Sequence, residues 1–281
     1  QWAFIEESGN YKVMIPVDKG NSEISFIVND PSGQADKKVL NVDSKQKGEL
    51  KVDEGRRYAL FIGVEEYDFA LPELETPVKD VDDVSKRLKN SQFFEIEKLI
   101  NPSKKEILDR LKAISNTLTD NDTLMVYYAG HGYMLKDNGR GYWLPRDASP
   151  QTPENWISNR DIARLFHRTR SKQILMVSDS CYSGAFVGTA TILKNDKDYF
   201  GKPRAVMGLS SGGEQPVWDG GGNGNSIFAA KLLETLGQGQ IVGESLYKQV
   251  KTRVVQESPQ VPGYGAMLMP GYDVGGVLEL K

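Results

Sequence analysis

The chain has 281 residues, enough for one large domain or for a medium domain with a small one. Its 39% hydrophobic and 26% charged residues are typical of globular proteins, and a net charge of −3 without a basic stripe argues against a nucleic-acid partner. No apolar run reaches the roughly 18 residues that a membrane span needs, and a single cysteine with two histidines excludes an internal disulfide and leaves few ligands for a metal site.

Residues 1–50 differ from the rest of the chain in their pattern. Apolar and polar residues alternate over residues 11–17 and 24–28, and a third short apolar stretch lies at residues 39–42. Turn residues separate these stretches, so the pattern predicts three short strands. Three strands alone are marginally stable, so we expect them to pair with other sequence, pack on a neighbouring domain or lie open. Their order resembles part of an immunoglobulin-like domain, and a charged linker follows to about residue 57.

From residue 57 onwards, predicted strands and helices alternate. Apolar runs predict strands at residues 57–64, 98–100, 123–129, 172–177, 205–210 and 277–280. The spacing of apolar residues predicts helices at residues 77–88, 103–118 and 161–169, after Ser226, and around Leu246, Val250 and Val254. Residues 103–106 match a capping box, and residues 132–134 and 142–144 suit a hairpin. This alternation predicts a mostly parallel α/β sheet with helices on both faces.

Two of the predicted strands end in small polar turns that hold the residues best suited to chemistry. One strand runs into Gly130-His131-Gly132, and a later one runs into Asp179-Ser180-Cys181. In open α/β sheets, ligands and reactions collect at the carboxyl ends of the strands. A thiol attacks as its thiolate, and a nearby imidazole can take the thiol proton and later protonate the leaving amine. We therefore assign Cys181 as a candidate nucleophile and His131 as its base and acid.

The segments Tyr127-Tyr128-Ala129-Gly130-His131-Gly132 and Asp179-Ser180-Cys181-Tyr182-Ser183-Gly184 resemble the two catalytic motifs of the caspase-like cysteine peptidases of clan CD. The branch they resemble is that of bacterial caspase homologues, metacaspases and orthocaspases rather than animal caspases. His131 lies 50 residues before Cys181, as expected for this family. The resemblance covers residues 56–281 and implies a cysteine endopeptidase.

The resemblance also implies an architecture. We expect a caspase-like, mostly parallel six-stranded sheet flanked by helices, preceded by the small all-β segment of residues 1–50. Within residues 56–281, a large-subunit-like part would span residues 56–188 and a small-subunit-like part residues 205–281. A linker between the two parts would span residues 189–204.

The family also indicates how the reacting carbonyl would be held. Its members use backbone N–H groups beside the catalytic pair as an oxyanion hole, and here these are the amides of Gly132 and Cys181. Donors of this kind typically contribute about 3 kcal/mol each to the transition state.

A basic P1 side chain is the substrate feature that the acidic residues imply. Asp179 stands two residues before the nucleophile, and in metacaspase-like members a second acid on the first helix matches Asp80. Charge-assisted hydrogen bonds to both carboxylates would favour cleavage after Arg or Lys. Ser210 and Trp218 lie where the family's second subunit completes this S1 pocket.

The segment from residue 183 to residue 204 is long for a connection in a compact domain. It matches the position of the family's inter-subunit linker, and the alternative is a plain surface loop. Its basic residues are candidate sites of self-cleavage: Lys194, Lys197, Lys202 and Arg204.

We expect no cofactor and no resident metal. Some metacaspases need calcium held by clustered acids, but here Arg160 stands beside Asp161 and would repel a divalent ion. Asp137 and Asp147 leave a weaker calcium site open.

Two other functions compete with the peptidase. The first is a non-catalytic caspase-like scaffold or binding module, against which the intact His131 and Cys181 argue. The second is a nucleotide-binding domain, which is disfavoured because the sequence has no Gly-rich phosphate loop. The expected partners are protein or peptide substrates with a basic P1 residue, and the metacaspase resemblance implies a monomer. Cytoplasmic location and export as part of a longer envelope protein both stay open.

Overall fold

The computed structural model describes residues 20–29, 35–44, 55–91, 95–135, 140–180, 205–212, 223–236, 241–267 and 279–280. Contacts divide the chain into two units, Gln1–Asp53 and Glu54–Lys281. In the first unit, β1 (Gly20–Asn29) and β2 (Ala35–Ser44) form an antiparallel pair. These strands contain the predicted stretches 24–28 and 39–42. The strand predicted at residues 11–17 lies outside the described residues.

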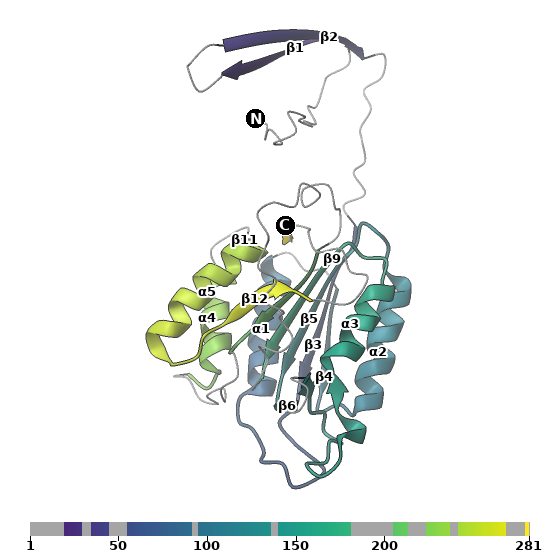
Figure 1. Ribbon diagram of the computed structural model, residues 1–281, viewed down its shortest axis with the longest axis vertical. Helices are drawn as coiled ribbons and strands as arrows, with labels where there is room; N and C mark the ends of the chain where they lie inside the picture. Colours follow the sequence, from purple (N-terminus) through teal and green to yellow (C-terminus); the bar gives the residue numbers. More distant parts are fainter. Residues whose placement is uncertain are drawn as a thin grey trace. The chain divides into compact units, whose positions relative to one another are not determined.

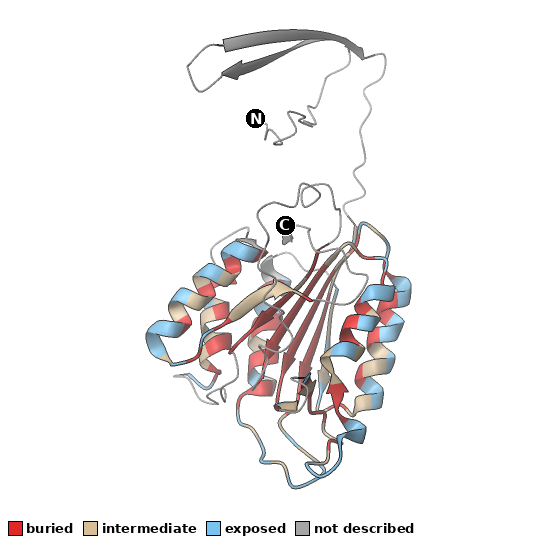
Figure 2. Ribbon diagram, viewed as in Figure 1, coloured by how far each residue is buried: buried red, intermediate tan, exposed pale blue. Residues whose placement is uncertain are grey.

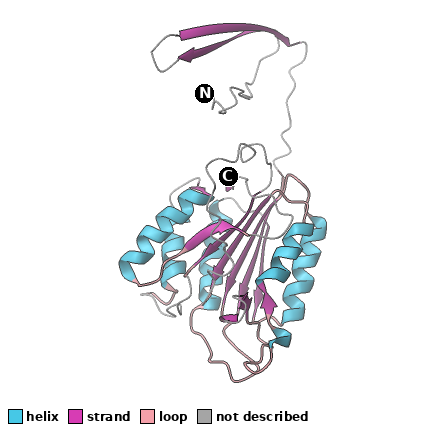
Figure 3. Cartoon of the chain, viewed as in Figure 1, coloured by secondary structure: helices cyan, strands magenta, loops and turns pink. Residues whose placement is uncertain are grey.

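The second unit is built on a central sheet. Among the described residues, six strands form it in the order β12-β10-β9-β5-β3-β4 (Figures 1 and 3). Neighbours pair in parallel except for the edge strand β12, which is antiparallel to β10. The predicted α/β class is therefore confirmed. In chain order the strands are β3 (Arg57–Gly63), β4 (Glu95–Ile100), β5 (Thr123–Ala129), β9 (Gln173–Asp179), β10 (Ala205–Ser210) and β12 (Gly263–Ala266).

Helices cover both faces of the central sheet, as Figure 1 shows. The first face packs against α1 (Pro77–Ser91), α4 (Ile227–Leu236) and α5 (Gly243–Glu257). The second face packs against α2 (Lys104–Thr117) and α3 (Asn159–Arg168). Each helix contains a segment that apolar spacing predicted, with ends shifted by a few residues. For α2 the predicted capping box is present, because the hydroxyl of Ser103 and the side chain of Glu106 satisfy each other's backbone N–H groups.

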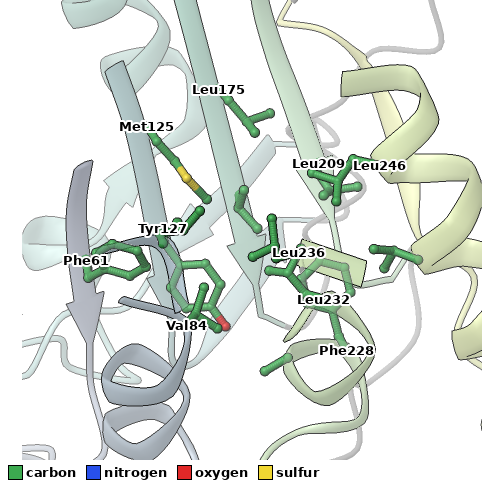
Figure 4. Packing of buried hydrophobic residues seen from close by; sticks show 14 of the residues in the cluster. Phe61, Val84, Met125, Tyr127, Leu175, Leu209, Phe228, Leu232, Leu236 and Leu246 are labelled. Atoms are coloured by element: carbon green, nitrogen blue, oxygen red, sulfur yellow. The ribbon is translucent and has the colours of Figure 1, made fainter. Parts of the chain in front are cut away.

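Alternation along the strands divides the core between these two faces. In β5, Met125 and Tyr127 pack toward α1 and α4, whereas Val126 and Tyr128 pack toward α2 and α3. The sheet is buried throughout its centre, as Figure 2 shows, because helices shield it on both sides. Figure 4 shows part of the first cluster, with side chains from the strands facing those of helices. Asp179 follows Val177 by two residues, so strand alternation assigns it to this first face as well.

Short strands complete the second unit. The predicted hairpin is confirmed as β6 (Gly132–Leu135) and β7 (Arg140–Trp143), which β8 (Ile157–Ser158) extends. The last predicted strand, at residues 277–280, is confirmed where it is described, as β13 (Glu279–Leu280). It pairs with β11 (Ile241–Val242) outside the central sheet.

The sixth strand of the central sheet is instead β12, which the sequence pattern did not predict. Its sequence, Gly-Tyr-Gly-Ala, is short and half glycine. Glycine is depleted in strands and typical of turns, so no local signal indicated pairing. Among the described helices, none is long and apolar enough to cross a membrane.

Candidate active site

The strand register brings the two predicted catalytic turns to one edge of the central sheet. Ala129 at the end of β5 pairs with Asp179 at the end of β9, and Gly130 N–H continues the ladder to Asp179 O at 3.3 Å. His131 and Cys181 are each two residues beyond this pair in the chain. Cys181 itself lies outside the described residues, so its role as nucleophile stays a prediction.

His131 is held by the loop that connects β3 to α1. Its Nε2 lies 2.8 Å from Pro72 O, its backbone N–H donates to the Tyr67 hydroxyl at 2.9 Å, and the rings of Tyr67 and His131 are 4.9 Å apart. A carbonyl oxygen only accepts, so this contact places the proton on Nε2 in the neutral imidazole. Nδ1 is then the basic nitrogen, available to take a proton from a thiol.

The contribution of this loop was missed from the sequence, which predicted only a connection there. The signal was its length: residues 64–76 separate β3 from α1, whereas connections in α/β units usually have about 2–6 residues. Loops of this length often carry function. The contacts that Tyr67 and Pro72 make with His131 depend on how the loop folds back, which no local pattern encodes.

Two glycines flank His131 for different reasons. Gly130 has φ +155°, and a Cβ there would lie 2.9 Å from the Tyr128 hydroxyl and 3.2 Å from Val64 Cβ. Gly132 pairs with Trp143, and the bond from Leu144 N–H to His131 O marks this as a pair without mutual hydrogen bonds. In such a pair the N–H groups point away from the partner strand. The Gly132 amide is therefore directed away from β7, as an oxyanion donor requires.

Ser226 donates hydrogen bonds to both predicted pocket carboxylates, Asp80 and Asp179. Asp80 lies in the first turn of α1 and is 1% exposed, and Asp179 is 6% exposed. The Ser226 hydroxyl donates to Asp179 Oδ2, while the Ser226 backbone N–H donates to Asp80 Oδ1 at 3.1 Å. Asn225 Nδ2 also donates to Asp80 Oδ1, at 2.9 Å. The sequence predicted Ser226 only as a helix cap, and its contacts with both acids are an additional finding.

Burial and the neighbouring acid disturb the ionisation of this pair. Burial, and then the charge of Asp179, raise the pKa of Asp80 to about 7. Tyr127 lies on the same face, and burial followed by the charges of both acids raises its pKa well above the usual value. The pKa of Asp80 rises because burial and a second like charge in the same buried region both disfavour ionisation.

The remaining predicted pocket residues have different outcomes. Ser210 is buried at the end of β10, where its hydroxyl accepts the Gly263 N–H at 3.2 Å and so contacts the edge strand β12. No described contact links it to the two acids, and its part in S1 stays a prediction. Trp218 and the candidate cleavage residues Lys194, Lys197, Lys202 and Arg204 lie outside the described residues.

The aspartates weighed as calcium ligands have other partners where they are described. Asp147 Oδ1 accepts the backbone N–H of Lys104 at 2.8 Å, at the first residue of α2. Asp161 accepts a hydrogen bond from the Ser158 hydroxyl at 2.6 Å. Asp137 lies outside the described residues. Within the described part of the chain, no group of three or more His, Cys, Asp or Glu side chains is placed to hold a metal ion.

Comparison with known proteins agrees with this architecture. The caspase-domain family (Peptidase_C14) matches residues 56–271. Among solved structures, caspase-1 from Spodoptera frugiperda is similar at 19% identity, covering 76% of this chain and 87% of that chain, with a TM-score of 0.58. A Geobacter sulfurreducens protein is similar at 17% identity, covering 76% of this chain and 94% of that chain, also with a TM-score of 0.58. At these identities the likeness shows the fold alone. No curated protein matches the chain.

Proposed function

The chain belongs to the family of caspase-domain peptidases, and from this premise we propose that it is a cysteine endopeptidase that cleaves peptide bonds after Arg or Lys. The observation that carries the proposal is the register of β5 and β9. Because Ala129 pairs with Asp179, the turns that hold His131 and Cys181 leave neighbouring strands at the same edge.

In the proposed reaction, Nδ1 of His131 takes the proton of the Cys181 thiol. The thiolate then attacks the carbonyl carbon of the scissile bond, and the carbonyl electrons move to the oxygen. The backbone N–H groups of Gly132 and Cys181 stabilise this oxyanion. As the C–N bond breaks, His131 gives its proton to the leaving amine, and a water molecule then hydrolyses the thioester.

The proposed preference for a basic P1 residue is supported by the buried acids. Asp80 and Asp179 share the donor Ser226 and lie beside the strand end that leads into Cys181. Burying two facing carboxylates without a cation is costly, and an Arg or Lys side chain would supply that cation. An acidic P1 side chain, as animal caspases select, would meet like charges here.

The first experiment compares peptides that differ only in P1. Fluorogenic substrates with Arg, Lys, citrulline and Asp at P1 are given to the wild type and to Cys181→Ala, His131→Ala and Asp179→Asn. Citrulline matches Arg in shape without its charge. His167→Ala is the matched control, since His167 is the other histidine of the chain and lies in α3.

We expect Cys181→Ala to abolish cleavage and His131→Ala to lower kcat by about 10²–10⁴-fold, with His167→Ala close to the wild type. Asp179→Asn should lower kcat/KM for Arg by roughly 10- to 100-fold, with a smaller effect on citrulline. Cleavage after Asp would refute the basic pocket. A wild type that stays inactive even after limited proteolysis would favour the non-catalytic scaffold.

We further propose that the enzyme processes itself at Lys194, Lys197, Lys202 or Arg204. The support is the match of residues 189–204 to the inter-subunit linker of the family and the basic residues that a Lys/Arg-specific enzyme would cut. Intact mass after incubation tests the idea. The wild type should yield two fragments with a boundary in this segment, and Cys181→Ala should stay whole; a wild type that also stays whole would disprove self-processing.

A further inference from the structure

A buried aromatic pair lies beneath the two catalytic turns. The Trp143 ring, at the end of β7, is fully buried and stacks on Tyr128 of β5, with ring centroids 4.3 Å apart and planes 8° from parallel. The Tyr128 hydroxyl lies 2.8 Å from His131 O and 3.0 Å from Leu144 O. Tyr128 thus holds the carbonyl of the histidine turn.

The Trp143 side of this aromatic pair is hydrogen-bonded to the serine residues that precede Cys181. Trp143 Nε1–H donates to the Ser178 hydroxyl at 2.9 Å, and the Ser178 and Ser180 hydroxyls are 3.0 Å apart. The two serine residues are buried, at 0% and 2% exposure. Because an indole N–H can only donate, Ser178 accepts from Trp143 and keeps its own hydrogen for a second bond. Ser180 is the residue directly before Cys181 in the sequence.

We propose that Tyr128, Trp143, Ser178 and Ser180 form a positioning chain that fixes the turn of Cys181 relative to the turn of His131. The proposal rests on the proposed function, which makes these two residues the catalytic pair. None of the four side chains needs to touch the substrate. Each acts by holding backbone at the ends of β5 and β9, where a displacement of about 1 Å can cost about 100-fold in rate.

Two kinds of contact, ring stacking and hydrogen bonding, give these four side chains their positioning effect. The stacked rings are rigid and fill the space between β5 and the β6–β7 hairpin, while the hydrogen bonds have a fixed direction and lie away from water. Losing one donor leaves a buried hydroxyl without its partner, so the turn can relax toward water or toward a new acceptor. Because Asp179 lies between Ser178 and Ser180, such a shift also reaches the predicted pocket acid, and the alkylation of Cys181 is the measurement that reports the thiol–imidazole distance separately.

The test replaces one indole, and with it the N–H, by a smaller aromatic ring. Trp143→Phe deletes the bond to Ser178. Trp156→Phe is its matched control, since it makes the same change in ring size and Trp156 Nε1–H donates at the same 2.9 Å to Ser149 O, a carbonyl outside both turns. We expect Trp143→Phe to lower kcat for the Arg substrate by about 10- to 100-fold. Trp156→Phe should keep the wild-type kcat.

A second measurement follows the reactivity of the Cys181 thiol without any peptide substrate. Cys181 is the sole cysteine of the chain, so alkylation by iodoacetamide, followed by intact mass over a range of pH, reports on it alone. A thiol held beside His131 should react with an apparent pKa below the usual value of about 8.5. Trp143→Phe should shift this apparent pKa upward toward that of His131→Ala, while Trp156→Phe should leave it in place.

Ser180→Ala tests the end of the positioning chain that lies next to Cys181 in the sequence. It also tests the proposal if Trp143→Phe fails to fold. It should show the same loss of kcat and the same alkylation shift, and the double variant should lose less than the sum of the two. Wild-type kcat and alkylation in Ser180→Ala, or a Trp143→Phe that behaves like Trp156→Phe, would overturn the positioning chain. A wild type without peptidase activity would refute the proposed function instead, and the alkylation profiles would still decide between the variants.

Discussion

At the residue scale, Asp80 is the group whose surroundings least suit its charge. The charge of Asp179 of β9 raises its pKa, and hydrogen bonds from Asn225 and Ser226, which stand directly before α4, lower it. Burial dominates and raises the Asp80 pKa to about 7. A carboxylate in an unfolded chain titrates near about 4.

The sign of the resulting pH effect follows from these two values. Between about pH 4 and pH 7 the folded chain binds a proton on Asp80 that the unfolded chain has already lost, so stability falls as the pH rises through this window. Asp80→Asn removes the charge and should raise Tm at about pH 8 by several degrees, a gain that vanishes toward about pH 4. Thermal unfolding of both proteins across this range checks it, and an equal Tm at the high end would contradict it.

The same titration should appear in substrate selection. Protonated Asp80 gives the pocket less charge, so kcat/KM for the Arg peptide should fall relative to the citrulline peptide as the pH drops below about 7. The ratio isolates the pocket because both peptides use the same catalytic pair. A ratio that stays constant from about pH 5.5 to 8.5 would show that Asp80 does not contact the P1 side chain.

At the scale of elements, Ser226 at the start of α4 both caps the helix and contacts the acidic pair. The Ser226 hydroxyl accepts the Ala229 N–H at 2.9 Å as a helix cap and also donates to Asp179. Ser158 caps α3 in the same way, accepting the Asp161 N–H at 3.1 Å. The two helices therefore offer matched caps, of which one is joined to the acidic pair.

This match makes a controlled comparison possible. Ser158→Ala should cost about 1 kcal/mol of stability and leave cleavage after Arg unchanged. Both caps also donate to a carboxylate, but Asp179 is buried, whereas the Asp161 side chain that accepts from Ser158 is 44% exposed. Ser226→Ala should therefore cost more, about 2 kcal/mol or above, and should lower kcat/KM for Arg about tenfold. Ser226→Thr, which keeps the hydroxyl, should restore most of both losses. Equal effects of the two alanine variants on Arg cleavage would leave Ser226 as a cap only.

At the scale of the whole molecule, the second unit has a core of its own. In the described part of the chain, the main buried clusters draw their members from residues 59–267. The fragment 54–281 should therefore unfold within about 2 °C of the corresponding transition in the full chain, a difference below about 1 kcal/mol. Calorimetry of both proteins tests this, and a larger drop would show that residues 1–53 stabilise the peptidase unit.

Local sequence signals were sufficient for much of this fold. Apolar runs and helical spacing predicted the order of strands and helices, and the capping box at Ser103 was confirmed, because these features depend on neighbours in the chain. The strand predicted at residues 277–280 is present as β13, but the sixth strand of the central sheet, β12, was not predicted. Strand β12 owes its place to pairing with β10, from Met207–Ala266 to Ser210–Gly263, rather than to its own propensity.

The candidate site was likewise predictable from the sequence only in part. The sequence by itself predicted the chemistry: a single cysteine and a histidine, each expected in a small turn after a buried strand, and an acid two residues before the cysteine. Only the tertiary structure decided which groups surround them. Pro72 O reaches His131, and Ser226 joins Asp80 to Asp179, across separations of 47 to 146 residues. Such contacts follow from strand register and from how loops and helices pack, whereas sequence patterns record only the periodicity of each element.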